Sequence, residues 1–156
     1  MRTIPFFASV ALVLPMFCHA QQASPDGLAC FENLATPEFP QAALQAHVDG
    51  SVWTTTHVSP QGTVDKIETQ VVSAWSDGPK MLTPPVEKAI RAARIKPECA
   101  GKDVSVVFRY QLHGEATANP KVTSKTEAPN LMWIESQPES RRETTAAGKA
   151  PVNSHP

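Results

Sequence analysis

The spacing of apolar and polar residues predicts a β-hairpin within residues 49–72. Two runs rich in valine, threonine, isoleucine and tryptophan, which suit a pleated surface, flank a short tetrapeptide. That tetrapeptide, Ser59–Gly62, carries proline second and glycine last, which is typical of a type I turn. We therefore expect two antiparallel strands here, with the other elements packed around them.

The phase of the first strand indicates which of its faces is covered. One face is shared by Val52, Thr54, Thr56 and Val58. The expected register places Thr54 opposite Ile67, so that Ile67 joins this apolar face. Val64 is out of step with Ile67 by one residue, and a β-bulge near Asp65–Lys66 is predicted to return it to the apolar side.

A helical period predicts one helix on each side of the hairpin. Pro40 suits the first turn of a short helix that continues to about His47. Thr83 is expected to cap a second helix, which ends at Lys96–Pro97. The apolar stripe of this second helix consists of Val86, Ala89, Ile90 and Ala93.

The two-residue period returns in Val104–Leu112 and predicts a third strand. The expected order within residues 36–114 is helix, strand, strand, helix, strand. Two helices cover one face of a small sheet, so we expect an α+β fold: a three-stranded antiparallel sheet with two helices packed on one face.

Residues 1–20 have the features of a cleavable secretory signal peptide. Arg2 precedes an apolar run that is too short to span a bilayer, and the small residue Ala20 precedes the expected cleavage point. The alternative is that this segment stays attached as a membrane anchor. Residues 21–35 then form an N-terminal arm, part of which is expected to lie across the domain.

Cleavage would leave two cysteines, Cys30 and Cys99, and an even pair in an exported chain predicts a disulfide. Closing a loop of about 70 residues stabilises a fold by roughly 4 kcal/mol on the chain-entropy model. A metal or redox site is the rival interpretation. It fails because neither cysteine has another cysteine or a histidine at ligand spacing.

The last part of the chain, residues 115–156, is rich in Ser, Thr, Pro, Ala, Glu and Lys and shows no periodicity. It offers too little apolar surface to offset the entropy of ordering, so we expect it to be disordered. One exception is the apolar cluster Leu131–Ile134. This cluster is either transient residual structure, a short binding segment, or a segment that folds back onto the edge of the sheet and blocks it.

Catalytic chemistry finds no positive support in the sequence. The formal net charge is −1 and no basic stripe is present, which argues against a nucleic-acid partner. His57 and His113 end strands that would be neighbours, but surface histidines are the commoner case there. Ser51 and Ser59 lack the context of a nucleophile, and no glycine-rich phosphate loop exists. We expect no catalytic residue, no metal and no cofactor.

Five short segments, taken in order, resemble the C-terminal domain of TonB. They are residues 37–40, 49–52, 61–64, 86–97 and 104–110. The resemblance covers about residues 36–114 and implies a periplasmic domain that meets outer-membrane transporters by strand addition. It therefore implies a protein partner, either a transporter segment or another envelope protein, and inner-membrane anchoring if the signal is not cleaved.

Carried over to this chain, the strand that receives the partner is the last predicted strand: Val104, Ser105, Val106, Val107, Phe108, Arg109, Tyr110, Gln111 and Leu112. An outer strand has unpaired N–H and C=O groups, which are a template for pairing. Trp53 is expected on the face away from the helices, where it is either a partner contact or is covered by the segment near Cys30.

TonB itself has an uncleaved N-terminal membrane helix and a long proline-rich spacer, and this chain departs from that pattern. We therefore expect a TonB-like periplasmic binding module linked to transmembrane transport, with no stable membrane anchor after signal cleavage. The alternative is an envelope structural protein that uses the same edge to form a homodimer and has no role in transport.

Overall fold

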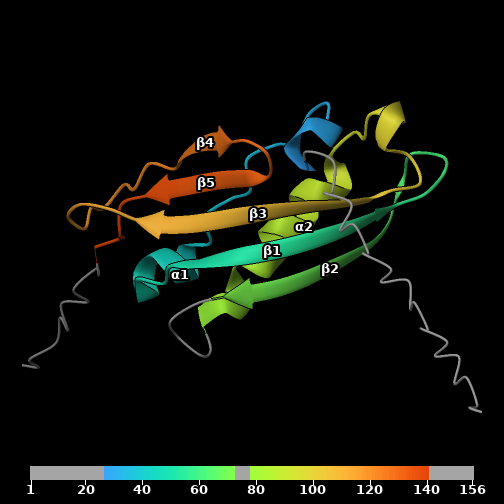
Figure 1. Cartoon of the computed structure of the whole chain (residues 1–156). Coiled ribbons are helices and arrows are strands. Elements are labelled where there is room, and N and C mark those ends of the chain that lie inside the picture. Colours follow the sequence, from blue (N-terminus) through green and yellow to red (C-terminus); the bar gives the residue numbers. More distant parts are fainter. Residues whose placement is uncertain (1–26, 73–77, 141–156) are drawn as a thin grey trace, which may run out of the picture.

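A five-stranded sheet forms the centre of the protein (Figure 1). The computed structural model describes residues 27–72 and 78–140. The strands are β1 (Gly50–Val58), β2 (Val64–Val72), β3 (Asp103–Leu112), β4 (Thr123–Glu127) and β5 (Leu131–Ser136). The helices are α1 (Gln41–Ala46) and α2 (Thr83–Ala92), with the 3-10 turns η1 (Gly27–Cys30), η2 (Gly78–Met81) and η3 (Pro97–Cys99). The α+β class is confirmed, whereas the expectation of three strands is wrong.

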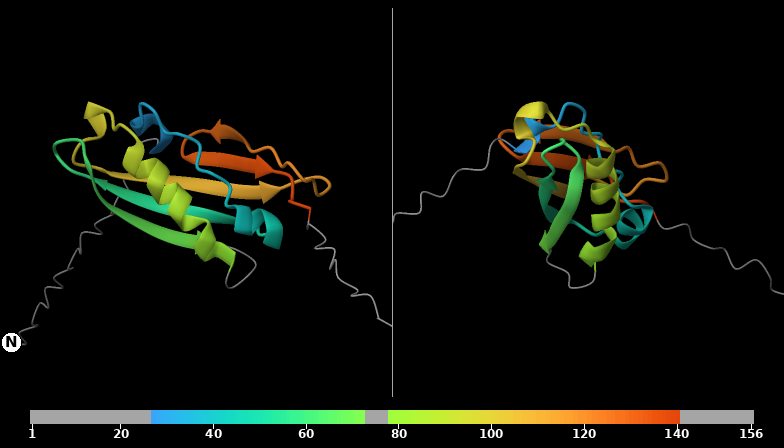
Figure 2. Two further views of the ribbon diagram at one scale, coloured as in Figure 1. Left: turned by 180° about the vertical axis from the view of Figure 1, so that it is seen from behind. Right: turned by 90° about the vertical axis from the view of Figure 1, so that its right-hand side faces the viewer.

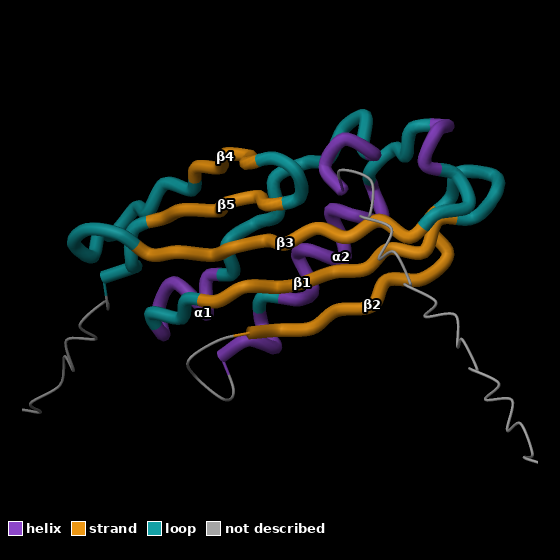
Figure 3. The backbone as a smooth tube through the Cα atoms, viewed as in Figure 1, coloured by secondary structure: helices purple, strands orange, loops and turns teal. Residues whose placement is uncertain are grey.

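The strand order is β2-β1-β3-β5-β4, which Figure 3 shows as five orange segments side by side. Every neighbouring pair is antiparallel except β3 and β5, which run parallel. The sheet is therefore mixed rather than antiparallel throughout. The predicted elements account for β1, β2 and β3, and the two remaining strands come from the region after residue 114.

The β1–β2 hairpin has the predicted faces and the predicted bulge. The register shifts between His57 and Val58, which leaves Asp65 without a partner residue and brings Val64 against the core. The pairing itself differs from the expected one, because Thr54 lies opposite Thr69 and not opposite Ile67.

Both helices lie on one face of the sheet, as the two views in Figure 2 show. The side chains between the helices and the sheet form the core. Those with less than 2 % exposure include Leu82, Val86 and Ile90 from the helical layer and Val52, Val104, Val106, Phe108 and Tyr110 from the strands. Helix α2 begins at Thr83, the residue expected to cap it, and ends at Ala92, before the predicted end at Lys96–Pro97; its stripe residues Val86, Ala89 and Ile90 are buried. The opposite face of the sheet, called the open face below, has no helix over it in the described part of the chain.

The predicted disulfide between Cys30 and Cys99 is confirmed. The segment that follows Cys30 lies across the domain as expected: Phe31 forms an isolated antiparallel bridge with Ile95, and the amide of Glu32 donates to the carbonyl of Arg94 at 2.9 Å. The predicted signal peptide, the first residues of the arm and residues 141–156 lie outside the described residues.

The region 115–140 is ordered, which corrects the expectation of a disordered tail. Strands β4 and β5 form an antiparallel hairpin with Lys125 opposite Trp133. On the helix side of β5, Met132 and Ile134 are buried in the same core as β3. These two side chains supply apolar surface that offsets the entropy of ordering the hairpin. The alternative in which Leu131–Ile134 folds back onto the sheet is confirmed.

Candidate partner-binding site

Strand β3 has one apolar face and one mixed face, as its two-residue period predicted. Towards the helices it presents Val104, Val106, Phe108 and Tyr110, all of them buried. Towards the open face it presents Ser105, Val107 and Gln111, which are half-buried, and Arg109, which is exposed. Antiparallel pairing with β1 extends along its length, from Asp103 opposite His57 to Tyr110 opposite Gly50.

The prediction that Val104–Leu112 is the outer strand of the sheet is wrong. Residues 107–112 pair with residues 131–136 of β5, so β3 lies between β1 and β5. The amide of Val107 donates to the carbonyl of Asn130 at 2.8 Å, and the amide of His113 donates to the carbonyl of Ser136 at 2.9 Å. The physical reason is that the unpaired N–H and C=O groups on the outer side of β3 need hydrogen-bond partners, and the chain supplies them from its own strand β5.

The first part of the same side of β3 is covered by η1. A Cβ atom built on Gly27 would lie 1.8 Å from the carbonyl oxygen of Ser105, so only glycine allows this close approach. The amide of Leu28 donates to the carbonyl of Pro129 at 3.2 Å, which connects η1 to the turn before β5. Two separate segments, η1 and β5, therefore cover the outer side of β3. The strands at the two ends of the described sheet are β2 and β4.

On the open face, one row of side chains crosses all five strands. Its members follow from the register: Gln70, Trp53, Val107, Leu131 and Glu127. Trp53 is 53 % exposed, so the alternative in which the segment near Cys30 covers it is wrong. This row has an apolar centre and polar ends, which is typical of a contact surface.

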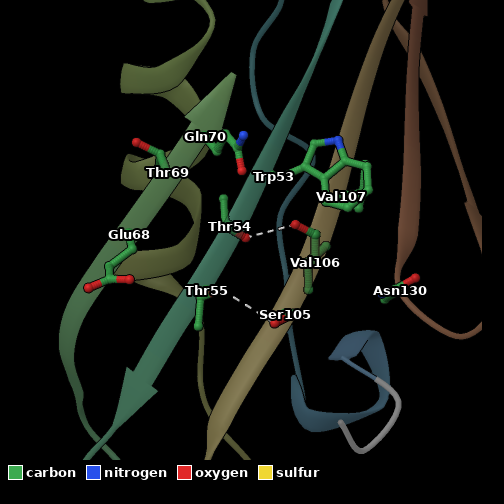
Figure 4. A pocket seen from close by; sticks show the side chains of 10 residues that line it. All are labelled: Trp53, Thr54, Thr55, Glu68, Thr69, Gln70, Ser105, Val106, Val107 and Asn130. Atoms are coloured by element: carbon green, nitrogen blue, oxygen red, sulfur yellow. Dashed lines mark hydrogen bonds between the residues drawn. The ribbon is translucent and has the colours of Figure 1, made fainter. Parts of the chain in front are cut away.

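A shallow cavity of about 380 Å³ lies beside this row (Figure 4). Trp53 and Val107 form its apolar wall, and Glu68, Gln70 and Asn130 add polar groups around it. Figure 4 also shows Thr54 and Thr55 reaching across to β3, where the hydroxyl of Thr54 donates to the carbonyl of Val106 at 2.9 Å. This bond adds to the backbone pairing of β1 with β3.

Trp133 of β5 is held on the open face by two cations. The Arg109 guanidinium carbon and the Lys125 ammonium nitrogen each lie 5.0 Å from the centroid of its ring. Its indole N–H donates to Glu127 at 3.0 Å, and Lys125 pairs with Glu135 at 2.9 Å. Cation–π contacts at such exposed positions contribute about 0.5–1 kcal/mol each. Sequence reasoning placed Arg109 on the receiving strand but did not pair it with Trp133.

The histidines do not form a common site. His57 lies at the start of the β1–β3 pairing and His113 directly after the far end of β3, so they are at opposite ends of the sheet. Nδ1 of His57 lies 2.6 Å from a carboxylate oxygen of Asp103, a cross-strand neighbour that sequence spacing did not reveal. Beside it, Lys66 holds the pKa of the Glu68 carboxyl below its ordinary value. Within residues 27–72 and 78–140, no group of three or more His, Cys, Asp or Glu side chains is placed to hold a metal.

Tyr110 joins β3 to the segment before α1. Its ring packs edge-on against Phe39, with centroids 5.1 Å apart, and its hydroxyl donates to the carbonyl of Glu38 at 3.4 Å. Burial raises the pKa of the Tyr110 phenol well above its usual range, and the nearby Glu38 carboxylate adds to the effect. The hydroxyl is thus a structural donor and not an acid that titrates near neutral pH.

The family described as the Gram-negative bacterial TonB protein C-terminal matches residues 35–113. The chain belongs to the TonB C-terminal family. No curated protein matches the chain with significance. Members of the TonB C-terminal family interact with proteins such as outer-membrane transporters, and membership indicates an envelope protein linked to transport.

The matched region ends one residue after β3, so the β4–β5 hairpin lies outside the part shared with the TonB C-terminal family. Within the described residues no helix has the length and apolar character needed to cross a membrane. The envelope location therefore rests on membership of the family.

Proposed function

We propose that this protein is a TonB-like binding module of the periplasm that pairs an extended segment of a partner protein with its strand β3. The partner segment belongs to an outer-membrane transporter or to another envelope protein. The proposal is supported by the match to the TonB C-terminal family and by the chemistry of β3. Main-chain hydrogen bonds supply affinity in such pairing, and sockets for alternate side chains supply specificity.

The observation that carries this proposal is that the outer side of β3 accepts a strand. Residues 107–112 already hold β5 in register, with Met132 and Ile134 inserted into the core beside Phe108 and Tyr110. A surface that receives one extended segment in this way has the hydrogen-bonding groups and the sockets to receive another. The receiving residues in the proposal remain Val104–Leu112, and Trp53 on the open face is a further contact.

The alternative of a self-associating structural protein uses the same residues of β3. Because members of the TonB C-terminal family interact with proteins such as outer-membrane transporters, we favour a partner protein over a homodimer. Sedimentation velocity at several protein concentrations distinguishes them. A sedimentation coefficient that rises with concentration would support the homodimer.

Titration with peptides from the N-terminal segments of outer-membrane transporters tests the proposal. The decisive variant is Val107→Pro, because the Val107 amide points to the outer side of β3 and not to β1. We expect at least a tenfold loss of affinity in this variant. Thr123→Pro on β4 is the matched control and leaves affinity unchanged, provided that circular dichroism shows both variants folded. Equal affinity of the wild type and Val107→Pro would defeat β3 as the receiving strand.

Export is part of the same proposal, with a signal peptide removed after Ala20. The intact mass of protein purified from the periplasm should correspond to a chain that begins at Gln21. Full-length protein recovered from the membrane fraction would instead support an uncleaved inner-membrane anchor.

A further inference from the structure

The β4–β5 hairpin is an addition to a domain that has its own means of stability. The disulfide between Cys30 and Cys99 lies entirely outside the hairpin. All five residues of β4 are exposed, so that strand adds nothing to the core. The region shared with the TonB C-terminal family ends at residue 113, before the hairpin begins. Departure of the hairpin would therefore leave the shared elements and the disulfide in place.

The contribution of β5 to the core is confined to few side chains. Met132 is 4 % exposed and Ile134 is fully buried, and these two fill sockets opposite Phe108 and Tyr110. If β5 left, the sockets would be open to water unless other apolar groups entered them. Hence a segment that takes the place of β5 needs apolar side chains at two positions separated by one residue.

The residue between the two sockets faces Arg109. In the present arrangement that residue is Trp133, which lies between Arg109 and Lys125. Arg109 belongs to β3 and would stay in place, whereas Lys125 belongs to the hairpin and would leave with it. A cation at this point favours an aromatic ring or a carboxylate.

We infer that β5 is an internal competitor for the partner's place on β3, and that the partner's segment displaces it. The segment carries two apolar side chains that replace Met132 and Ile134, with an aromatic or acidic residue between them that contacts Arg109. This inference rests on the proposed function, since it assumes pairing by strand addition. The affinity for the partner is then reduced by the fraction of molecules in which β5 still occupies β3.

Displacement also has to release the contacts that fix the ends of the hairpin. The carbonyl of Pro129 accepts a hydrogen bond from Leu28, and the amide of Glu139 donates to the carbonyl of Leu44 at 3.3 Å. The hydroxyl oxygens of Thr36 and Ser124 lie 2.6 Å apart. All three contacts are hydrogen bonds, and once the hairpin has left, water replaces each of them at a small net cost.

A crosslink between β3 and β5 tests the inference in the full chain. Gln111 and Glu135 are direct neighbours in the register, so Gln111→Cys with Glu135→Cys ties β5 to β3. Thr123 and Glu135 are neighbours within the hairpin, so Thr123→Cys with Glu135→Cys is a matched control that ties β5 only to β4. Mass spectrometry confirms that each new disulfide has formed.

The first probe is a fluorescent synthetic peptide with the sequence of residues 130–137, which contains β5. We expect Ile134→Ala protein to bind it at least tenfold more tightly than the wild type does, because its own β5 competes less well. The β3-tied variant should not bind it, and the hairpin-tied control should bind it as the wild type does. A peptide with Ile134→Asp is the negative control. Equal binding by the two crosslinked variants would overturn the inference.

The second probe is the set of transporter peptides, which separates the two proposals. Loss of their binding in the β3-tied variant alone supports displacement. Equal binding by both crosslinked variants means that the partner pairs with another strand, so the inference fails; binding of transporter peptides then stands, but β3 is not the receiving strand. Exchange with the β5 peptide but no binding of any transporter peptide supports displacement and overturns the transporter segment as the partner.

Discussion

Ile134 of β5 lies directly opposite Tyr110 of β3, and both side chains are buried in the core. Tyr110 belongs to the region shared with the TonB C-terminal family, whereas Ile134 lies outside it. The hydrophobic core of this protein thus crosses the boundary of the family domain. The same pairing that completes the core also occupies the strand on which a partner is proposed to bind.

Shortening Ile134 should destabilise the protein markedly. Ile134→Ala removes buried methyl and methylene groups and leaves a cavity, which typically costs about 2–5 kcal/mol in the free energy of unfolding. Thr126→Ala on the exposed β4 is the control and should change that energy by less than about 0.5 kcal/mol. Urea unfolding followed by circular dichroism measures both. Equal stability of the two variants would mean that β5 is not part of the core in solution.

Removing the disulfide should lower stability by a comparable amount. Cys30 and Cys99 are separated by 69 residues, and opening a loop of that size costs roughly 4 kcal/mol on the chain-entropy model. We expect this loss in urea unfolding of the double variant Cys30→Ala with Cys99→Ala. Wild-type protein treated with a reductant should unfold at the same urea concentration as the variant. A loss below about 1 kcal/mol would contradict the expected contribution.

The elements of the family domain could be predicted because their periods are clear. The two-residue alternation identified both faces of β1 and of β3, and the stripe of α2 identified its buried side. The predicted register of the β1–β2 hairpin was wrong by two residues because the turn is longer than expected. The Thr63 amide donates to the side chain of Ser59 at 3.0 Å, so Thr63 belongs to the turn, and the bulge at Asp65 adds a further shift.

Strand β5 could not be predicted from its own residues. Leu131 and Trp133 on one face and Met132 and Ile134 on the other are all apolar, so the segment has no two-residue alternation. Strand β4 contains only Thr, Ser, Lys and Glu. The hairpin is ordered by its pairing with the outer side of β3. Because β3 and β5 run parallel, no tight turn joins them, and the sequence therefore carries no turn signal for this pairing. The sequence shows the apolar cluster Leu131–Ile134, but it does not show that the outer side of β3 receives this cluster.

Tyr110 should control the stability of the protein at alkaline pH. It is the one tyrosine in the chain, so phenolate absorbance reports on it alone. Its pKa is raised in the folded state, first by burial and then by Glu38, so the neutral phenol is favoured there. This contribution to stability is complete below the ordinary tyrosine pKa of about 10 and is lost as pH rises above it.

We therefore expect the urea midpoint of the wild type to fall above pH 10 and that of Tyr110→Phe to fall less. Phenolate absorbance should appear together with unfolding and not before it. A phenolate signal with a midpoint near pH 10 in folded protein would show that the Tyr110 hydroxyl is accessible to solvent.

Gly27 should be intolerant of any side chain. A Cβ atom at this position would lie 1.8 Å from the Ser105 carbonyl oxygen, which is backbone and has little room to move. Gly27→Ala should therefore push η1 away from β3, at a cost of about 1–3 kcal/mol. Hydrogen exchange should become faster at the amides of η1. Ala29→Ser, an exposed change in the same turn, should leave both exchange and stability unaltered.

Trp53 offers a test of the open face as a contact surface. Its side chain is 53 % exposed beside Val107, so Trp53→Ala should change the free energy of unfolding by less than about 1 kcal/mol. If a bound segment lies along β3, the indole is near enough to contact a side chain of that segment, and such aromatic contacts commonly supply 2 kcal/mol or more of binding energy, as an order of magnitude.

We therefore expect about a thirtyfold loss of affinity for the transporter peptides in Trp53→Ala, as measured by fluorescence anisotropy. Val72 is the matched control, because it is 52 % exposed on the same face but lies on β2, away from β3. Val72→Ala should bind as the wild type does. If both variants retain full affinity, the partner is held by strand pairing alone and the open face has another role.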